Sequence, residues 1–316
     1  MNNAIKLYES MPLQRSNDVD LEKWLPYFLA ELDAAESTKK TYARIIRIFS
    51  RYLKENDITL PHKTDLIVYK EHLKASGKSA NTIQNYIIGI KQIFKWALDK
   101  NLYHEDITKG VKGVKLPKEH QRDALTKAQV QAVAKTFDRS TLKGKRDYAL
   151  FILMVTTGAR TIELVRADIA DIGSYYGEGA LFVQGKGMID KSRPLKIAFT
   201  TEQALKDYLA ARGNADDSAP LFASISNQNK GGRLSTRSIR SIIQDALEKS
   251  IVKTKRTSAH SLRHTFATEN LLAGGTLQET QNVLGHASIS TTMKYTHNHQ
   301  RQNNNSESRV ADALFS

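Results

Sequence analysis

Cysteine is absent from the 316 residues of this chain, which excludes disulfide bonds, thiolate catalysis and cysteine-based zinc sites. No apolar run approaches the roughly 20 residues that a membrane-spanning helix needs. Residues 1–12 lack the basic segment and apolar core of a secretory signal. We therefore expect a soluble, cytoplasmic protein that has no membrane partner.

Acidic residues are the minority among the charged ones. The chain has 47 Lys and Arg residues against 33 Asp and Glu, and its net charge is +14. A positive field favours a polyanion such as nucleic acid, although a solvated basic surface would have the same composition. A chain of this length is sufficient for two domains with separate cores.

Residues 21–100 have apolar positions every three or four residues and polar breaks near Ser37, Pro61 and Gly77, which predicts a small helical bundle. Wound as a helix, residues 37–56 divide into an apolar stripe and an opposite basic stripe. Such a basic stripe can follow a phosphate backbone, although it could also be a solvated face. We assign DNA binding to its basic residues, Lys40, Arg44, Arg47 and Arg51.

Residues 106–122 contain glycines, a proline and several lysines but show no periodicity, which is typical of a linker. We expect extended backbone here, with Lys112 and Lys115 following DNA between two domains. The predicted order is therefore an N-terminal extension, a helical DNA-binding domain, a basic linker, a second domain and a C-terminal tail, at residues 1–18, 19–105, 106–122, 123–300 and 301–316.

The second domain is predicted to be mainly helical with a small β-sheet. Thr126 caps one helix, and residues 146–157 form a buried helix that ends at Gly158. Helical patterns return at residues 201–211, 236–249, 261–273 and 276–284. Strand-like runs occupy residues 169–172, 180–183 and 193–198, and the last two flank the turn Gly185-Lys186-Gly187.

Three motifs in this domain carry charged or nucleophilic side chains. In the first, Arg160 and Glu163 lie three residues apart at the start of a helix. The two could form an ordinary surface ion pair. Because Arg160 follows a glycine turn after a buried helix, its guanidinium could instead enter a cleft and hold a phosphate, oriented by Glu163.

The second motif begins a helix with His260 and Arg263 one turn apart. His260 and His264 also have the spacing of a zinc pair, but Ser261 stands where a metalloprotease helix carries glutamate, and no carboxylate ligand is near. We therefore assign no metal site. His260 could alternatively be a core histidine.

The third motif contains His286 and, nine residues later, Tyr295. A lone tyrosine is more often a core or interface residue than a nucleophile. Together with Lys186, however, the motifs supply two arginines, two histidines, a lysine and a phenol without a carboxylate cluster. Arginines can neutralise a phosphorane, histidines can move protons and a phenol can attack in line, so the set suits phosphodiester chemistry without a metal ion or other cofactor.

In this order the motifs resemble those of the tyrosine recombinase (phage integrase) family. Each motif is weak alone, but the set is specific, and the resemblance covers about residues 21–299. It is closer to Xer-type and phage or transposon integrases than to Cre-like members, which have tryptophan at the place of His286. The resemblance implies a mainly α fold with a small β-sheet, in which a helical core-binding domain and a mainly helical catalytic domain form a clamp around DNA. The motifs are Gly-Ala-Arg160-x-x-Glu163, Gly-Lys186-Gly, His260-x-x-Arg263 and Leu-Gly-His286 followed by Tyr295.

The same resemblance implies a role for each site residue. Tyr295 attacks phosphorus, forms a covalent 3′-phosphotyrosyl bond and releases a 5′-hydroxyl. Arg160 and Arg263 hold the non-bridging oxygens, and Glu163 supports the site without contacting the phosphate. The implied proton acceptor, general acid and hydrogen-bond donor to the phosphate are His260, Lys186 and His286.

The implied partners are double-stranded DNA with paired inverted core sites and a homo-tetramer on that DNA, joined through exchange of the C-terminal tail. The implied reaction proceeds without ATP through a Holliday junction and serves integration, excision or resolution of a mobile element or replicon. Because the segment before the bundle is short, we expect no arm-binding domain. Two alternatives stay open: a type IB topoisomerase-like enzyme that relaxes DNA, and a catalytically silent DNA-binding protein.

Overall fold

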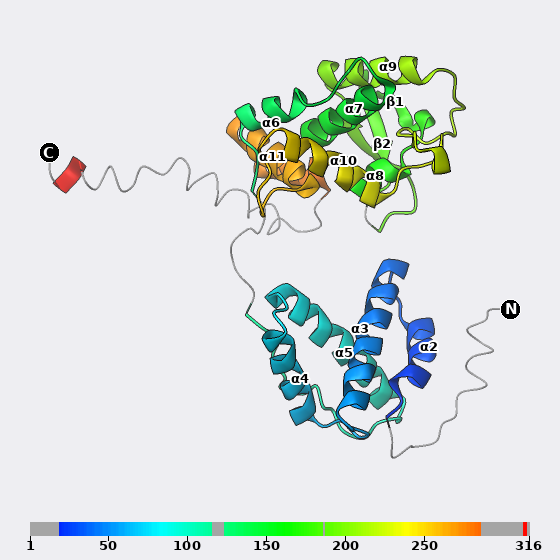
Figure 1. Cartoon of the computed structure of the whole chain (residues 1–316), viewed down its shortest axis with the longest axis vertical. Coiled ribbons are helices and arrows are strands. Elements are labelled where there is room, and N and C mark those ends of the chain that lie inside the picture. The colour runs from blue at the N-terminus through cyan, green and yellow to red at the C-terminus, as the bar shows by residue number, and fades with distance from the viewer. Residues whose placement is uncertain (1–18, 116–122, 186, 286–311, 315–316) are drawn as a thin grey trace. The chain divides into compact units, whose positions relative to one another are not determined.

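The computed structural model describes residues 19–115, 123–185, 187–285 and 312–314. The chain divides into two compact units, residues 1–119 and 120–316 (Figure 1). The mainly helical fold with a small sheet that the sequence predicts is confirmed. None of the described helices is both long enough and apolar enough to cross a lipid bilayer.

The first unit is a helical bundle. Helices α2 and α5 both pack against α3, and α4 packs against α5. The connections between these helices fall close to the polar breaks at Ser37, Pro61 and Gly77. The described helices are α2 (Leu21–Glu31), α3 (Glu36–Glu55), α4 (Lys63–Ala75) and α5 (Ala80–Asp99).

Local sequence explains how α5 begins and which face it buries. The Ser79 hydroxyl caps the helix by accepting a hydrogen bond from the Thr82 backbone N–H at 3.2 Å. The predicted apolar side of this helix is buried, and Ile90, Ile93 and Phe94 are at most 1% exposed. They share a core with Phe49 of α3, whose ring centroid lies 6.4 Å from that of Phe94.

The chain after α5 departs from the extended linker that its composition predicts. Ile107 and Val111 are buried in the core of the first unit, and a turn covers residues 107–110. The Lys91 ammonium donates a hydrogen bond to the Val111 carbonyl at 2.6 Å. Two apolar side chains therefore hold this part of the basic segment against the bundle, while Lys112 and Lys115 stay exposed.

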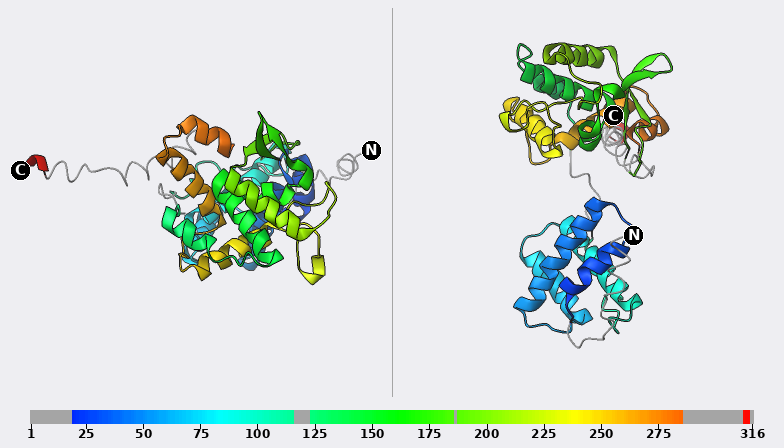
Figure 2. Two further views of the ribbon diagram at one scale, coloured as in Figure 1. Left: turned by 90° about the horizontal axis from the view of Figure 1, so that it is seen from above. Right: turned by 90° about the vertical axis from the view of Figure 1, so that its right-hand side faces the viewer.

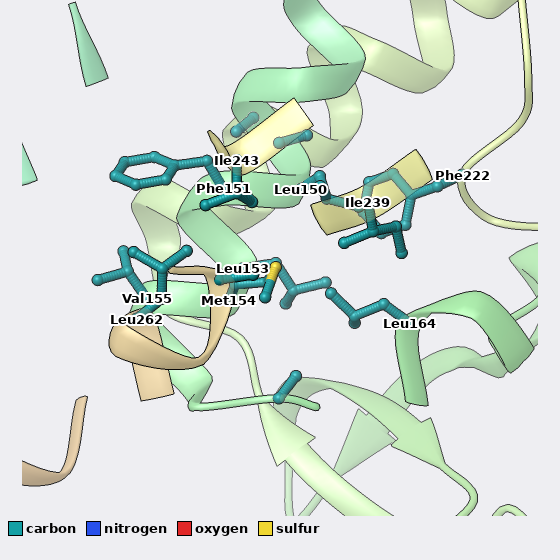
Figure 3. Packing of buried hydrophobic residues seen from close by; sticks show 14 of the residues in the cluster. Leu150, Phe151, Leu153, Met154, Val155, Leu164, Phe222, Ile239, Ile243 and Leu262 are labelled. Carbon is teal, nitrogen blue, oxygen red and sulfur yellow. The ribbon is translucent and has the colours of Figure 1, made fainter. Parts of the chain in front are cut away.

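The second unit is built around helix α7 (Leu142–Thr157), most of whose side chains are buried. Figure 3 shows Leu150, Leu153 and Met154 of this helix among apolar side chains from several other elements. The remaining described helices of the unit are α6 (Lys127–Ala134), α8 (Thr161–Arg166), α9 (Phe199–Arg212), α10 (Thr236–Lys249), α11 (Ala259–Leu272) and α12 (Leu277–Leu284), with short 3₁₀ turns at Ile169–Asp171 and Asn227–Asn229.

Three strands form an antiparallel sheet in the order β1-β2-β3 at the edge of this unit (Figure 2). Strands β2 (Glu178–Val183) and β3 (Arg193–Lys196) lie where the sequence predicts them. The predicted strand at 169–172 is wrong, because residues 169–171 form a 3₁₀ turn and β1 is Ile172–Tyr175. Tyr176 and Gly177 close the hairpin with φ values of 52° and 81°, the positive angles of a tight two-residue turn.

Candidate active site

Helix α7 ends in a glycine turn that sets the direction of Arg160. Gly158 has a φ of 64° and caps α7 in the left-handed conformation. A Cβ atom there would lie 2.6 Å from Leu284 Cδ2 and 2.9 Å from Phe266 Cδ1, so only glycine allows α11 and α12 to approach this turn. Arg160 follows as the N-cap residue of α8.

Glu163 is a buried carboxylate, and it orients Arg160 through two contacts. Its side chain is 0% exposed. Glu163 Oε2 accepts a hydrogen bond from the Arg160 backbone N–H at 2.7 Å, as in a capping box, and Oε1 accepts one from Arg160 Nη1 at 2.9 Å. The two residues therefore do not form a solvated surface pair. Glu163 fixes the guanidinium from the protein interior.

Arg263 of α11 is 2% exposed and is held by the ends of two helices. Its Nη1 donates a hydrogen bond to the Gly158 carbonyl at 2.7 Å, and its Nη2 donates one to the Leu284 carbonyl at 2.6 Å. Carbonyl groups at a helix C-terminus have no partner inside the helix and carry partial negative charge. The C-termini of α7 and α12 thus orient this buried cation.

Arg193, the first residue of β3, lies beside these two arginines, although it belongs to none of the sequence motifs. Its Nη2 lies 2.7 Å from Glu163 Oε1, and its Nη1 donates a hydrogen bond to the Val283 carbonyl at 2.5 Å. The alternating faces of the strand could have indicated its position. Arg193 shares a face with Leu195, which is 1% exposed, so this arginine had to point inward.

The three arginines meet at the C-terminus of α12. Arg193, Arg263 and Arg160 donate to three consecutive carbonyl groups, those of Val283, Leu284 and Gly285, the last at 3.1 Å from Arg160 Nη2. We call Arg160, Arg193 and Arg263 the arginine cluster. With Glu163 as its buried counter-charge, the cluster keeps an excess of positive charge beside the segment that leads into His286.

His260 lies in the first turn of α11 and is exposed, whereas His264 one turn later is buried. Their rings meet edge to face with centroids 4.9 Å apart. In the described part of the chain, no three His, Cys, Asp or Glu side chains are placed to hold a metal ion together.

The connection between β2 and β3 is anchored on both sides of position 186. The Gln184 amide donates to the carbonyls of Met188 and Ile189 at 2.8 and 3.0 Å. Lys191 Nζ lies 2.5 Å from a carboxylate oxygen of Asp168 and of Asp171. Burial lowers the pKa of Lys191, but its hydrogen bonds to the two carboxylates outweigh this effect and raise the pKa above its usual value. Lys186, His286 and Tyr295 lie outside the described residues.

Comparison with known proteins identifies the family. The model of the phage integrase family matches residues 123–302, and the model of the phage integrase N-terminal SAM-like domain matches residues 21–101. The chain belongs to the phage integrase family. This tyrosine recombinase is therefore an enzyme of site-specific DNA recombination, and the two alternative functions are not favoured.

Its relatives include tyrosine recombinases XerD of Listeria monocytogenes serotype 4b (strain F2365) and of Staphylococcus epidermidis (strain RP62A). The first is 28% identical over 89% of this chain and 94% of the relative, and the second 30% over 88% and 93%. Solved structures with the same fold are XerH recombinase in a post-cleavage complex with difH DNA and a lambda integrase tetramer on a Holliday junction. The XerH structure has a TM-score of 0.69 at 24% identity and covers 93% of this chain and 84% of its own. The lambda integrase structure has a TM-score of 0.69 at 18% identity, with 92% and 83% covered.

The recombinase presents a basic face on α3 of its first unit. The four cations assigned to DNA binding are exposed, while the opposite side of the helix is buried in the bundle. Ile45, Ile46 and Phe49 on that buried side are 0% exposed. The residues of the basic face are Lys40, Arg44, Arg47 and Arg51.

Replacing Arg44 and Arg47 together by glutamine should weaken DNA binding to a similar degree on specific and non-specific sequences. Each lost phosphate contact reduces counterion release, so the slope of log K against log salt should become shallower by about 2. Fluorescence anisotropy over a salt series measures this slope. Lys74→Gln, which removes a cation paired with Glu71 at 2.8 Å on α4, is the control, and an unchanged slope in the double variant would contradict the assignment.

Proposed function

We propose that this recombinase cuts a DNA strand by attack of Tyr295 on the scissile phosphorus and rejoins it by the reverse reaction. The Tyr295 oxygen forms a bond to phosphorus while the bond from phosphorus to the 5′ oxygen breaks. The products are a 3′-phosphotyrosyl ester and a 5′-hydroxyl. One ester replaces another of similar energy, so rejoining requires no ATP.

The arginine cluster is the observation that best supports this chemistry. Arg160 and Arg263 would bind the non-bridging oxygens, whose negative charge grows in the transition state. Donors that are oriented beforehand and shielded from water stabilise such charge strongly. Here the orientation comes from Glu163 and from the carbonyl groups that end α7 and α12.

Two proton transfers complete the proposed reaction. His260 would accept the proton of Tyr295, and its exposed position at the start of α11 leaves it accessible to substrate. Lys186 would donate a proton to the leaving 5′ oxygen. The Gln184 contacts, which tie the ends of its turn together, would limit the movement of this acid. His286 would donate a hydrogen bond to the phosphate.

The proposed substrate is duplex DNA with two inverted core sites, on which four protomers assemble and exchange strands through a Holliday junction. The two units would close around the DNA as a clamp. The C-terminal tail would join neighbouring protomers. Leu314, in the short helical turn at 312–314, is 69% exposed, and an apolar side chain in so small a segment gains stability only against another surface. The biological role would be integration, excision or resolution of a mobile element or replicon.

A suicide substrate tests the proposed function. A duplex selected for binding from a random-sequence library is nicked close to the cleavage position, so that the short strand with the new 5′-hydroxyl diffuses away. We expect a covalent protein–DNA complex that accumulates in excess EDTA, because the arginines would supply the positive charge that metal ions supply in metal-dependent nucleases. Intact paired sites should yield Holliday junctions.

Other results of this experiment would favour a different function for the chain or contradict the metal-free mechanism. A covalent complex without junctions, together with relaxation of supercoiled DNA, would indicate the topoisomerase-like alternative. Binding without any covalent complex would indicate the silent DNA-binding protein. Strict dependence of cleavage on added Mg²⁺ would contradict the metal-free mechanism.

A further inference from the structure

Arg193 connects the strand after the Lys186 turn with the phosphate-binding arginines. It begins β3 and lies opposite Val183, the last residue of β2. From this position its guanidinium reaches Glu163 at 2.7 Å and the Val283 carbonyl at 2.5 Å. The side chain of Arg193 therefore contacts α8 and the end of α12, while its backbone is part of the sheet.

The contact between Arg193 and Glu163 acts through charge. Arg193 Nε and Nη2 are buried and form no hydrogen bond with any described residue, although Nη2 lies within ion-pair distance of the carboxylate. Glu163 accepts its hydrogen bonds from Arg160. Arg193 thus supplies a second positive charge to a carboxylate whose hydrogen bonds are made elsewhere.

This second charge changes what Arg160 can do. With Arg160 as its only partner, the buried carboxylate would cancel most of the charge of that arginine, since electrostatic interactions are strong where water is excluded. With Arg193 on the same oxygen, Glu163 is shared between two cations. Arg160 then remains positive toward a phosphate while staying fixed by Glu163.

Arg193 also lies against the turn that precedes His286. Gly285 has a φ of 59°, and a Cβ atom there would lie 3.3 Å from Arg193 Cδ. The Val283 carbonyl, one of those left without a helical partner at the end of α12, is bonded by Arg193. The same side chain therefore shares Glu163 with Arg160 and also stabilises the backbone where the chain leaves α12.

We propose that Arg193 is a third arginine of the active site, a positioning residue that compensates Glu163 so that Arg160 keeps its charge for the scissile phosphate. This inference rests on the proposed function. The site would bind phosphate strongly because two arginines share one buried glutamate. Arg193 would then affect catalysis in addition to the stability of the fold.

The test compares two substrates that differ in charge. Single-turnover formation of the covalent complex is measured at saturating protein on suicide duplexes with either the normal scissile phosphodiester or an uncharged methylphosphonate. Arg193→Gln should slow cleavage of the phosphodiester about 10- to 100-fold, the range for groups that orient a site from behind. On the methylphosphonate the cleavage rate of the same variant should fall only a few-fold, because the uncharged group develops less negative charge in the transition state. Arg193→Lys, which keeps the positive charge, should lie between wild type and Arg193→Gln.

Two further variants separate the charge effect from folding. Lys196→Gln, on the same strand, removes an exposed cation paired with Glu178 and should behave as wild type. The double variant Arg193→Gln/Glu163→Gln removes the buried carboxylate together with its partner. It should fold and cleave the phosphodiester better than Arg193→Gln alone, because no buried carboxylate then cancels the charge of Arg160. Thermal unfolding of each variant is measured in parallel.

The outcomes are distinguishable. Wild-type cleavage by Arg193→Gln, an equal loss on both substrates, or a double variant that is no better than Arg193→Gln would overturn the inference. If wild-type protein forms no covalent complex on the phosphodiester, the proposed function fails and the role of Arg193 fails with it.

Discussion

Tyr295→Phe should bind target DNA with near wild-type affinity and form no covalent complex. Phenylalanine keeps the aromatic ring but lacks the oxygen that we propose as the nucleophile, so the chemical step would have no attacking group. The expected loss is complete within the detection limit of a denaturing gel, which makes this the largest predicted effect of a single substitution. Binding is measured by anisotropy on the same suicide duplex.

The matched control is Tyr176→Phe, which removes the hydroxyl of a tyrosine that is 87% exposed in the β1–β2 hairpin. It should cleave at the wild-type rate. Peptide mapping of the wild-type complex locates the phosphotyrosyl bond directly. A modified peptide that contained Tyr208 or another tyrosine in place of Tyr295 would show the assignment to be wrong.

Arg263→Ala should reduce the rate of cleavage about 1,000-fold, in line with the loss of a preoriented donor to a developing negative charge. It should also lower the free energy of unfolding by about 2 to 4 kcal/mol, since the buried carbonyls of Gly158 and Leu284 both lose their donor. Single-turnover cleavage and chemical denaturation measure the two effects separately.

Arg263→Lys distinguishes the catalytic effect from the structural one. A lysine keeps the charge in a compact ammonium group, but it cannot bridge two carbonyl groups as the planar guanidinium does. It should therefore recover part of the stability while cleavage stays at least about 10-fold slow. Arg139→Lys is the surface control, because that arginine is 53% exposed beside Asp207. If Arg263→Lys cleaved as fast as wild type, charge alone would be sufficient at this position.

The helices of both units could be predicted because their signals are local. Ser79 and Thr126 cap the helices that follow them, and Gly158 ends α7 in a left-handed turn. Apolar residues at helical spacing also located the buried side of α3 and, by exclusion, its basic face. The strand at 169–172 was predicted wrongly because the apolar content of a short run does not distinguish a strand from a 3₁₀ turn.

The sequence alone was also sufficient to predict a chemistry for this protein, since the order and spacing of Arg160, Lys186, His260-x-x-Arg263 and Tyr295 are covalent facts of the chain. How the arginines are oriented was decided only by the tertiary structure. Arg160 and Gly285 are 125 positions apart, and Arg193 and Val283 are 90 apart. The carbonyl groups that hold the cluster belong to the backbone and are available only where α12 ends. No side-chain pattern records which distant cation will meet a helix terminus, so Arg193 entered the site only when the chain was folded.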